Sequence, residues 1–155
     1  MLEIKAPVLR HFCTLEVEIS PPMSVGSGRS GQRRIIPITG GRVTGPGISG
    51  RVVGVGADWQ TVRPDGVADL SARYAFETDD GALIEILNEG YRHAPDAVNR
   101  RIAAGEAVSP DDYYMRTTAR LETGHPDYAW VNRTMFVGTG AKTAAGVQID
   151  LYAVE

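Results

Sequence analysis

The sequence predicts a mainly β fold: a single antiparallel β-barrel with one short α-helix, in one domain covering residues 1–155. Apolar and polar residues alternate in several segments, 18 Gly and 9 Pro interrupt these segments at short intervals, and only one segment has a helical pattern. A chain of 155 residues suits one hydrophobic core. We favour a closed barrel over a sandwich because closure leaves no exposed strand edge.

The first expected strand, Leu9–Ile19, shows the alternation most clearly. Its odd-numbered residues are apolar except His11, and its even-numbered residues are polar except Phe12. Cys13 belongs to the apolar set, and as the only cysteine it has no partner for an intramolecular disulfide. We therefore expect Cys13 to be a small core residue.

The middle of the chain is expected to contain a loop followed by short strands. Segment Ser24–Arg34 is rich in Gly and Ser, so it has little apolar surface to offset the entropy of ordering it, and we expect a mobile loop over one barrel end. In the turns Pro64–Gly66 and Asp79–Gly81, Asp precedes Gly, which is typical of a meander of hairpins. The strands expected here cover residues 34–39, 42–44, 48–55, 58–62, 67–78 and 82–89.

One segment, between Pro95 and Gly105, has the features of a helix. It opens with an acidic residue, continues with helix formers, carries two Arg in its second half and stops at Gly. Strands are then expected at residues 113–122, 128–137 and 147–154, with turns at 124–127 and 138–140.

The charge balance disfavours several classes of partner. The chain has 16 Lys and Arg against 19 Asp and Glu, a net charge of −3 and a pI near 5.6. We expect neither a nucleic acid nor a membrane as partner, since both need a basic surface. The chain has no apolar run of a signal peptide or membrane span, so a cytoplasmic protein is expected, and a homo-oligomer is left open.

The motifs of common cofactors and metals are lacking. Segment Gly26–Gly31 matches G-x-G-x-x-G, but a dinucleotide site needs a helix after it, and the β-type run Ile35–Ile38 follows instead. His11, His93 and His125 lie far apart and outside any metal-binding motif. We therefore expect no cofactor and no metal.

Several short motifs follow one another at consistent spacings. They are Gly54–Gln60, Arg63–Gly66, Ala72–Tyr74, Thr78–Ile84, Asn88–Arg92, Tyr113–Thr117 and Ala129–Arg133. In this series the chain resembles the domain-of-unknown-function 3237 family from about residue 8 to its C-terminus. The resemblance implies a lipocalin-like or allene-oxide-cyclase-like barrel, and it implies no reaction.

Polar residues inside the expected strands are candidates for a site in the barrel lumen, because each strand residue of a barrel faces either solvent or lumen. Guanidinium groups fit carboxylates and enolate-like oxygens, and a carboxylate whose pKa is raised by burial can act as a general base. The predicted catalytic residues are Asp58, Glu89, Arg73 and Arg116, with Asp58 or Glu89 as the base. The predicted substrate-binding residues are Trp59, Tyr114, Trp130, Asn132 and Arg92.

Each candidate also has a structural interpretation. The arginines can face solvent, Asp58 and Glu89 can be ion-pair partners of an arginine, and the tryptophans can belong to the core. The pattern does not decide whether Tyr114 faces the lumen or solvent, because both faces of its strand carry polar atoms.

Two functions from different classes remain. One is a cofactor-independent lyase, isomerase or cyclase that uses acid–base chemistry on an apolar or aromatic molecule with a carbonyl or carboxylate group. The other is a carrier that binds such a molecule without turnover. Many barrel carriers are secreted, and this sequence has no signal-peptide run. We therefore favour the enzyme. A filled barrel with a structural role is a third, weaker interpretation.

Overall fold

A computed structural model of the chain describes residues 1–155 and contains nine strands, one α-helix and two 3-10 helices. In chain order the elements are β1 (Leu9–Ile19), β2 (Met23–Gly28), β3 (Gly31–Gly45), β4 (Ile48–Val62), β5 (Ala68–Thr78), β6 (Leu83–His93), α1 (Asp96–Ala103), η1 (Pro110–Asp112), β7 (Tyr114–Glu122), η2 (Pro126–Arg133), β8 (Phe136–Lys142) and β9 (Gly146–Val154).

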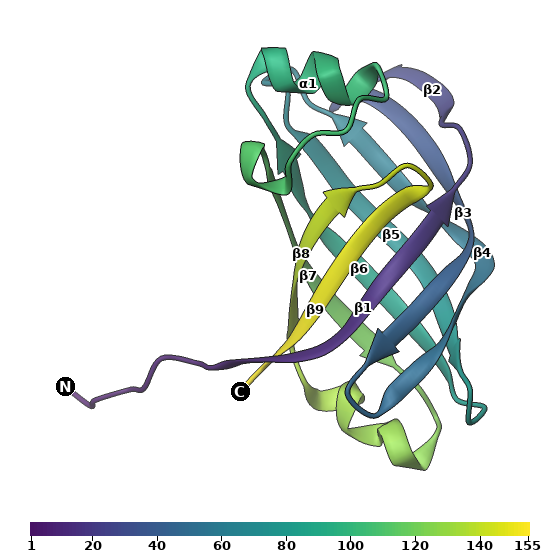
Figure 1. Cartoon of the computed structure of the whole chain (residues 1–155). Coiled ribbons are helices and arrows are strands. Elements are labelled where there is room, and N and C mark those ends of the chain that lie inside the picture. Colours follow the sequence, from purple (N-terminus) through teal and green to yellow (C-terminus); the bar gives the residue numbers. More distant parts are fainter.

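The strands form one antiparallel sheet in the order β1-β9-β8-β7-β6-β5-β4-β3-β2. An additional pairing of β1 with β3 closes eight of them into a barrel, and β2 pairs only with β3, outside the closed ring (Figure 1). The predicted fold class is confirmed. Closure satisfies the backbone of every strand in the ring through its two neighbours.

The two ends of the barrel differ in what covers them. Helix α1 lies across one end and η2 lies at the opposite end, and we call these the α1 end and the η2 end (Figure 1). The residues before β1 lead away from the barrel near the η2 end (Figure 1). Helix α1 falls inside the predicted segment 95–105. None of the helices combines the length and apolar character needed to cross a membrane.

The η2 half of the lumen is filled by hydrophobic side chains. Phe76, Phe136 and Ile84 have no exposed surface. Trp130 packs edge-on against Phe12, with 5.1 Å between the ring centroids. Burial of each large apolar side chain stabilises the fold by about 1.5–3 kcal/mol, so the packing of this half stabilises the barrel strongly.

A bulge in β1 corrects the expectation for Phe12. The register with β9 shifts between His11 and Cys13, and both Phe12 and Cys13 are buried. The bulge places two consecutive side chains on the inner face, which strict alternation does not allow. Cys13 is a core residue as expected, and burial raises the pKa of its thiol to about 12.

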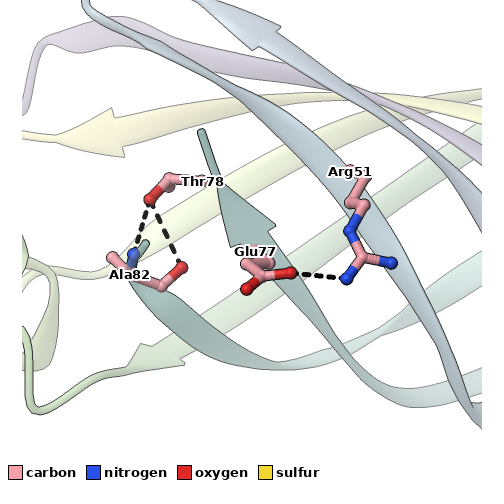
Figure 2. Close-up of polar contacts among 4 residues, drawn as sticks. All are labelled: Arg51, Glu77, Thr78 and Ala82. Carbon is pink, nitrogen blue, oxygen red and sulfur yellow. Dashed lines mark hydrogen bonds and ion pairs between the residues drawn. The ribbon is translucent and has the colours of Figure 1, made fainter. Parts of the chain in front are cut away.

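The outer wall carries exposed ion pairs, one of which is shown in Figure 2, where Arg51 Nη2 lies 2.6 Å from Glu77 Oε2. Figure 2 also shows the turn between β5 and β6, in which Thr78 Oγ1 accepts the Ala82 N–H at 2.8 Å. Thr78 is buried, whereas both members of the ion pair are exposed. An exposed ion pair contributes about 0–1 kcal/mol, so the buried bond matters more to the turn.

The seam that closes the barrel depends on a glycine. Gly41 of β3 pairs with Val17 of β1 and has φ 135°. A Cβ atom at Gly41 would lie 1.9 Å from the backbone oxygen of Glu16. Gly40 and Gly41 were expected to separate two strands, but β3 continues through them as an irregular segment, so one long strand spans the barrel.

The expected loop Ser24–Arg34 is instead a β-hairpin. Strand β2 pairs with the start of β3 from Met23 opposite Ile35 to Gly28 opposite Gly31. Backbone hydrogen bonds to β3, which projects past the ring, order this segment. We expected a mobile loop because the segment has little apolar surface to bury, but these bonds order it without such burial.

The expected strand 128–137 is also wrong. Residues 126–133 form η2, and β8 starts only at Phe136 and includes the expected turn 138–140. Pro126 suits the first turn of a helix, and the His125 side chain accepts the Asp127 N–H. Tyr128 and Val131 of η2 are buried, so this segment closes the η2 end with apolar side chains.

Candidate functional site in the barrel lumen

Four strands carry a charged side chain at an inward position near the α1 end. Each continues the inward alternation of its strand: on β6, for example, Ile86 and Asn88 are buried and Arg92 has the same parity. The four residues are Arg34 on β3, Asp58 on β4, Arg92 on β6 and Lys142 on β8, and all are half-buried.

The Asp58 carboxylate is held by two bonds. The β4–β5 ladder is interrupted after Asp58, and the Ser71 N–H donates to Asp58 Oδ1 at 2.8 Å instead. Gln60 Nε2 donates to Asp58 Oδ2 at 2.9 Å, and Gln60 Oε1 in turn accepts Arg34 Nε at 2.7 Å. A short chain of bonds therefore fixes Arg34, Gln60 and Asp58 relative to one another.

The cations of Arg92 and Lys142 have no such partner. Neither side chain makes a hydrogen bond or an ion pair within the chain. By contrast, five other arginines each donate a side-chain hydrogen bond: Arg33, Arg34, Arg51, Arg63 and Arg73. Tyr113 lies beside them, and its hydroxyl oxygen accepts the Lys142 backbone N–H at 2.7 Å. The proton of the Tyr113 hydroxyl is left free to be donated.

Burial shifts the pKa of all four charged groups. It raises the pKa of Asp58, against the opposing effects of the Ser71 and Gln60 hydrogen bonds and of the arginines. It lowers the pKa of Arg34, Arg92 and Lys142, and the nearby arginines lower that of Lys142 further. Three cations face one carboxylate, so the α1 half of the lumen has an excess of positive charge.

Apolar residues of α1 and its flanks cover this half. Ala94, Val98, Ile102 and Val108 are partly buried and pack against the core. The charged groups therefore lie between an apolar cover and the hydrophobic η2 half. Electrostatic interactions are stronger in such surroundings than in water.

Among the predicted site residues, only Asp58 and Arg92 belong to this cluster. Arg73 lies on the outer wall, where its Nη2 is 2.6 Å from Glu85 Oε1 and 68% of its side chain is exposed. It faces outward because the adjacent Tyr74 is buried. Glu89 is exposed and accepts a 3.4 Å hydrogen bond from Ser71.

The predicted residues Arg116, Trp59 and Tyr114 are exposed as well. Arg116 Nη1 donates to the Met115 carbonyl at 2.9 Å, and its guanidinium lies over the Tyr114 ring. Met115 is buried, which sets both of its neighbours outward. Trp59 is 45% exposed.

The two predicted residues of η2 have structural contacts. Asn132 Nδ2 donates to the Thr123 carbonyl and Asn132 Oδ1 accepts the Thr123 N–H, both at 2.9 Å. Trp130 packs against the core. The predicted convergence of Arg73, Arg116 and Asn132 in one cavity with Asp58 or Glu89 is therefore wrong.

Three of these residues do share an open groove on the outer wall. It has a volume of about 670 Å³ and is lined in part by Trp59, Arg73 and Asn132. The charge of Arg73 is already balanced by Glu85, and both polar atoms of the Asn132 side-chain amide are used in its bonds to Thr123. The groove thus offers a ligand fewer free polar groups than the lumen does.

Comparison with known proteins places the chain in a family. Residues 7–154 match the family described as "Protein of unknown function (DUF3237)". The chain belongs to the DUF3237 family. The resemblance found in its sequence motifs is thereby confirmed.

Relatives of this DUF3237 member share its fold over their whole length. The UPF0311 protein RPA1785 of Rhodopseudomonas palustris is 46% identical over 145 residues, which are 94% of this chain and 95% of the relative. Its crystal structure, described as a conserved protein of unknown function, has a TM-score of 0.93 and covers 98% of this chain and 100% of that one. A β-barrel-like protein from Acinetobacter baumannii is 37% identical, with a TM-score of 0.87 and full coverage of both chains.

A more distant likeness concerns the fold alone. A crystal structure of an enzyme from Penicillium herquei has a TM-score of 0.75 and 20% sequence identity, and it covers 100% of this chain and 99% of that one.

Sequence reasoning missed several polar residues in the barrel lumen of this DUF3237 member. They are Arg34, Gln60, Tyr113 and Lys142. A usable signal was the phase of each strand: Arg34 lies in phase with Ile36 and Ile38, and Lys142 with Phe136. Tyr113 has the parity of the buried Met115 and Thr117, but its hydrogen bond to Lys142 depends on β8 lying next to it.

Proposed function

We propose that this protein binds a small organic anion, such as a carboxylate, in the α1 half of the barrel lumen. The observation that carries the proposal is that Arg92 and Lys142 are half-buried cations without an acceptor in the chain. Buried charges are usually paired, because an unpaired charge loses its hydration without compensation. An anionic ligand would supply the missing partner.

The surrounding residues support a ligand with an apolar body. Met115 is directly opposite Arg92 in the β6–β7 register, and Leu70 lies on the neighbouring strand; both are 5% exposed. The Tyr113 hydroxyl can donate to the same anion. Guanidinium groups bind carboxylates through two parallel hydrogen bonds, so Arg92 would orient the acid group. We infer an aromatic or aliphatic acid of modest size.

Isothermal titration calorimetry with a panel of aromatic and aliphatic carboxylates tests this binding. We expect Arg92→Met to weaken binding by about 2–5 kcal/mol, roughly 30-fold or more, as for loss of one partner of a buried charge pair. Arg73→Met is the matched control, since Arg73 is exposed and paired with Glu85, and we expect it to leave affinity unchanged. Equal affinities of the two variants would contradict the proposal.

A second candidate function is cofactor-independent acid–base catalysis on the bound anion. It is favoured by Asp58, a carboxylate whose pKa is raised by burial next to the proposed anion site. A lyase, isomerase or cyclase reaction would use Asp58 as the base and Tyr113 as a proton donor.

The Asp58→Asn variant separates enzyme from carrier. If the protein is an enzyme, the variant should bind the anion at least as tightly, because a neighbouring negative charge is removed, and lose turnover by at least about 100-fold, because the base is missing. Turnover would be followed by NMR of ligands that calorimetry has identified. Turnover that survives the substitution would exclude Asp58 as the base, and absence of turnover in the unaltered protein would favour a carrier.

A further inference from the structure

Two cations of the α1 half, Arg92 and Lys142, lack a partner at the same time. Neither makes an ion pair or a side-chain hydrogen bond, and both are half-buried, so part of each side chain remains accessible. Buried charges are normally paired, because the loss of hydration is otherwise uncompensated. A ligand with a single acid group would balance the charge of only one of the two.

The carboxylate of Asp58 does not balance both cations. One of its oxygens accepts the Ser71 N–H and the other accepts Gln60 Nε2, and Gln60 in turn accepts a hydrogen bond from Arg34. Asp58 is thus held on the side of Arg34. Even when Asp58 is ionised, three positive charges against one negative charge leave an excess of two in this half of the lumen.

The three cations also repel one another. Burial lowers the pKa of Lys142, and the positive charges of Arg92 and Arg34 lower it further. Burial lowers the pKa of Arg92 in the same way, with an added effect of Arg34. Charges influence each other in this manner only when they lie close together, so a ligand that contacts Arg92 is also attracted by Lys142.

An apolar side chain separates the two unpaired cations. Met115 on β7 is directly opposite Arg92 on β6, and a Cβ atom at Gly140 on β8, two residues before Lys142, would lie 2.7 Å from Met115 Sδ. Strands β6 and β8 flank β7 and are therefore about 10 Å apart, so Arg92 and Lys142 extend from separate positions on the wall. A ligand that pairs with both needs two acid groups joined by an apolar spacer, rather than two charges on one group.

We infer that the α1 half of the lumen binds a dicarboxylate, with one acid group on Arg92 and the other on Lys142. The inference rests on the proposed function, which requires only one acid group, and narrows its ligands to acids with two. The planar guanidinium of Arg92 suits a bidentate contact, whereas the Lys142 ammonium is a point charge that accommodates a carboxylate in several orientations. The hydrocarbon between the two acid groups would lie over Met115.

Matched pairs of ligands that differ by one charge test this inference by calorimetry at about pH 7, where all their acid groups are ionised. Each dicarboxylate is compared with the acid in which a carboxamide of the same shape replaces one carboxylate. The pairs are succinate with succinamate, glutarate with glutaramate, isophthalate with 3-carbamoylbenzoate, and terephthalate with 4-carbamoylbenzoate. We expect the dicarboxylate of at least one pair to bind about tenfold tighter or better, because it pairs with a second half-buried cation.

Substitutions of Lys142 assign the advantage of the dicarboxylate to that residue. Lys142→Met should remove most of it, and Lys142→Arg, which keeps the charge, should retain it. Arg116→Met is the control, since Arg116 is exposed on the outer wall and the variant should keep the full advantage. If Lys142→Met does not fold, the ligand pairs alone still decide, because equal affinities within every pair contradict the inference.

The remaining outcomes separate this inference from the proposed function. Binding of single acids that depends on Arg92, with no advantage for any dicarboxylate, would overturn this inference and leave the proposed function standing. An advantage that persists in Lys142→Met, or tighter binding of phenyl phosphate than of every dicarboxylate, would contradict two separate acid groups. No binding of any acid would overturn both.

Discussion

The Asp58 side chain is the only carboxylate among the charged groups of the α1 half. Its pKa is raised above the ordinary 3.8, so the folded state favours the protonated form. Asp58 therefore contributes most to stability at pH values below its ordinary pKa. This contribution declines as the pH rises through its raised pKa in the folded state. The same titration changes the charge of the lumen that a ligand would meet.

Anion binding should accordingly depend on pH in two steps. We expect the affinity for an arylsulfonate, which stays ionised throughout, to fall as pH rises through the raised pKa of Asp58, because a negative charge develops beside the ligand. It should fall again in the alkaline range, where Lys142 loses its charge at a pH below the ordinary 10.5. Calorimetry across the pH range measures both steps.

Single substitutions identify the two groups. Asp58→Asn should remove the acidic step and Lys142→Met the alkaline one. If the fall in affinity at acidic pH persists in Asp58→Asn, another group must cause that fall.

At the residue scale, the sequence identified Asp58 and Arg92 but also many outward residues. Arg73 lies inside the expected strand 67–78 and Arg92 just after the expected strand 82–89, and nothing in their residue type distinguishes them. The buried Tyr74 fixes Arg73 outward, whereas Arg92 has the parity of the buried Ile86. Strand phase decides between them, and phase requires knowing which alternating set faces the core.

At the scale of an element, the β5–β6 turn shows which contacts hold a hairpin. The Thr78 hydroxyl accepts the buried Ala82 N–H, and neighbouring Glu77 pairs with Arg51 on the outer wall (Figure 2). We expect Thr78→Val to reduce the free energy of unfolding by about 1–3 kcal/mol, because it leaves a buried N–H without its acceptor. Urea denaturation measures the change.

The control for this turn is Arg51→Met, which removes an exposed ion pair of the same hairpin region. We expect it to change the free energy of unfolding by about 0–1 kcal/mol. Similar losses for the two variants would mean that the Thr78 bond is not what stabilises the turn.

Elements with strong local signals were predictable, and those stabilised by distant contacts were not. Helix α1 has its acidic residue, its arginines and its glycine in the expected order. The β2–β3 hairpin and η2 have no comparable signal, because β2 is ordered by pairing with β3, and η2 by burial of Tyr128 and Val131 against the barrel. In both cases a tertiary contact overrides local composition.

At the scale of the whole molecule, closure of the barrel creates the candidate site. Arg34, Arg92 and Lys142 come from strands β3, β6 and β8, none of which is adjacent to another in the sheet. Their side chains act on one another only because the sheet curves round and β1 pairs with β3. The irregular segment at Gly41 in that seam is thus a condition for the site as well as for the fold.

The sequence by itself determined the fold class, the place of α1 and the membership of the family. These follow from alternation, turn residues and motif order, which are local or collinear properties of the chain. Only the tertiary structure decided which polar residues meet, because each depends on a bulge, a strand phase or a neighbour across the lumen. Arg92 and Lys142 illustrate the difference: their types are ordinary for a strand, and their charges act on one another only once β6 and β8 lie in the same closed wall.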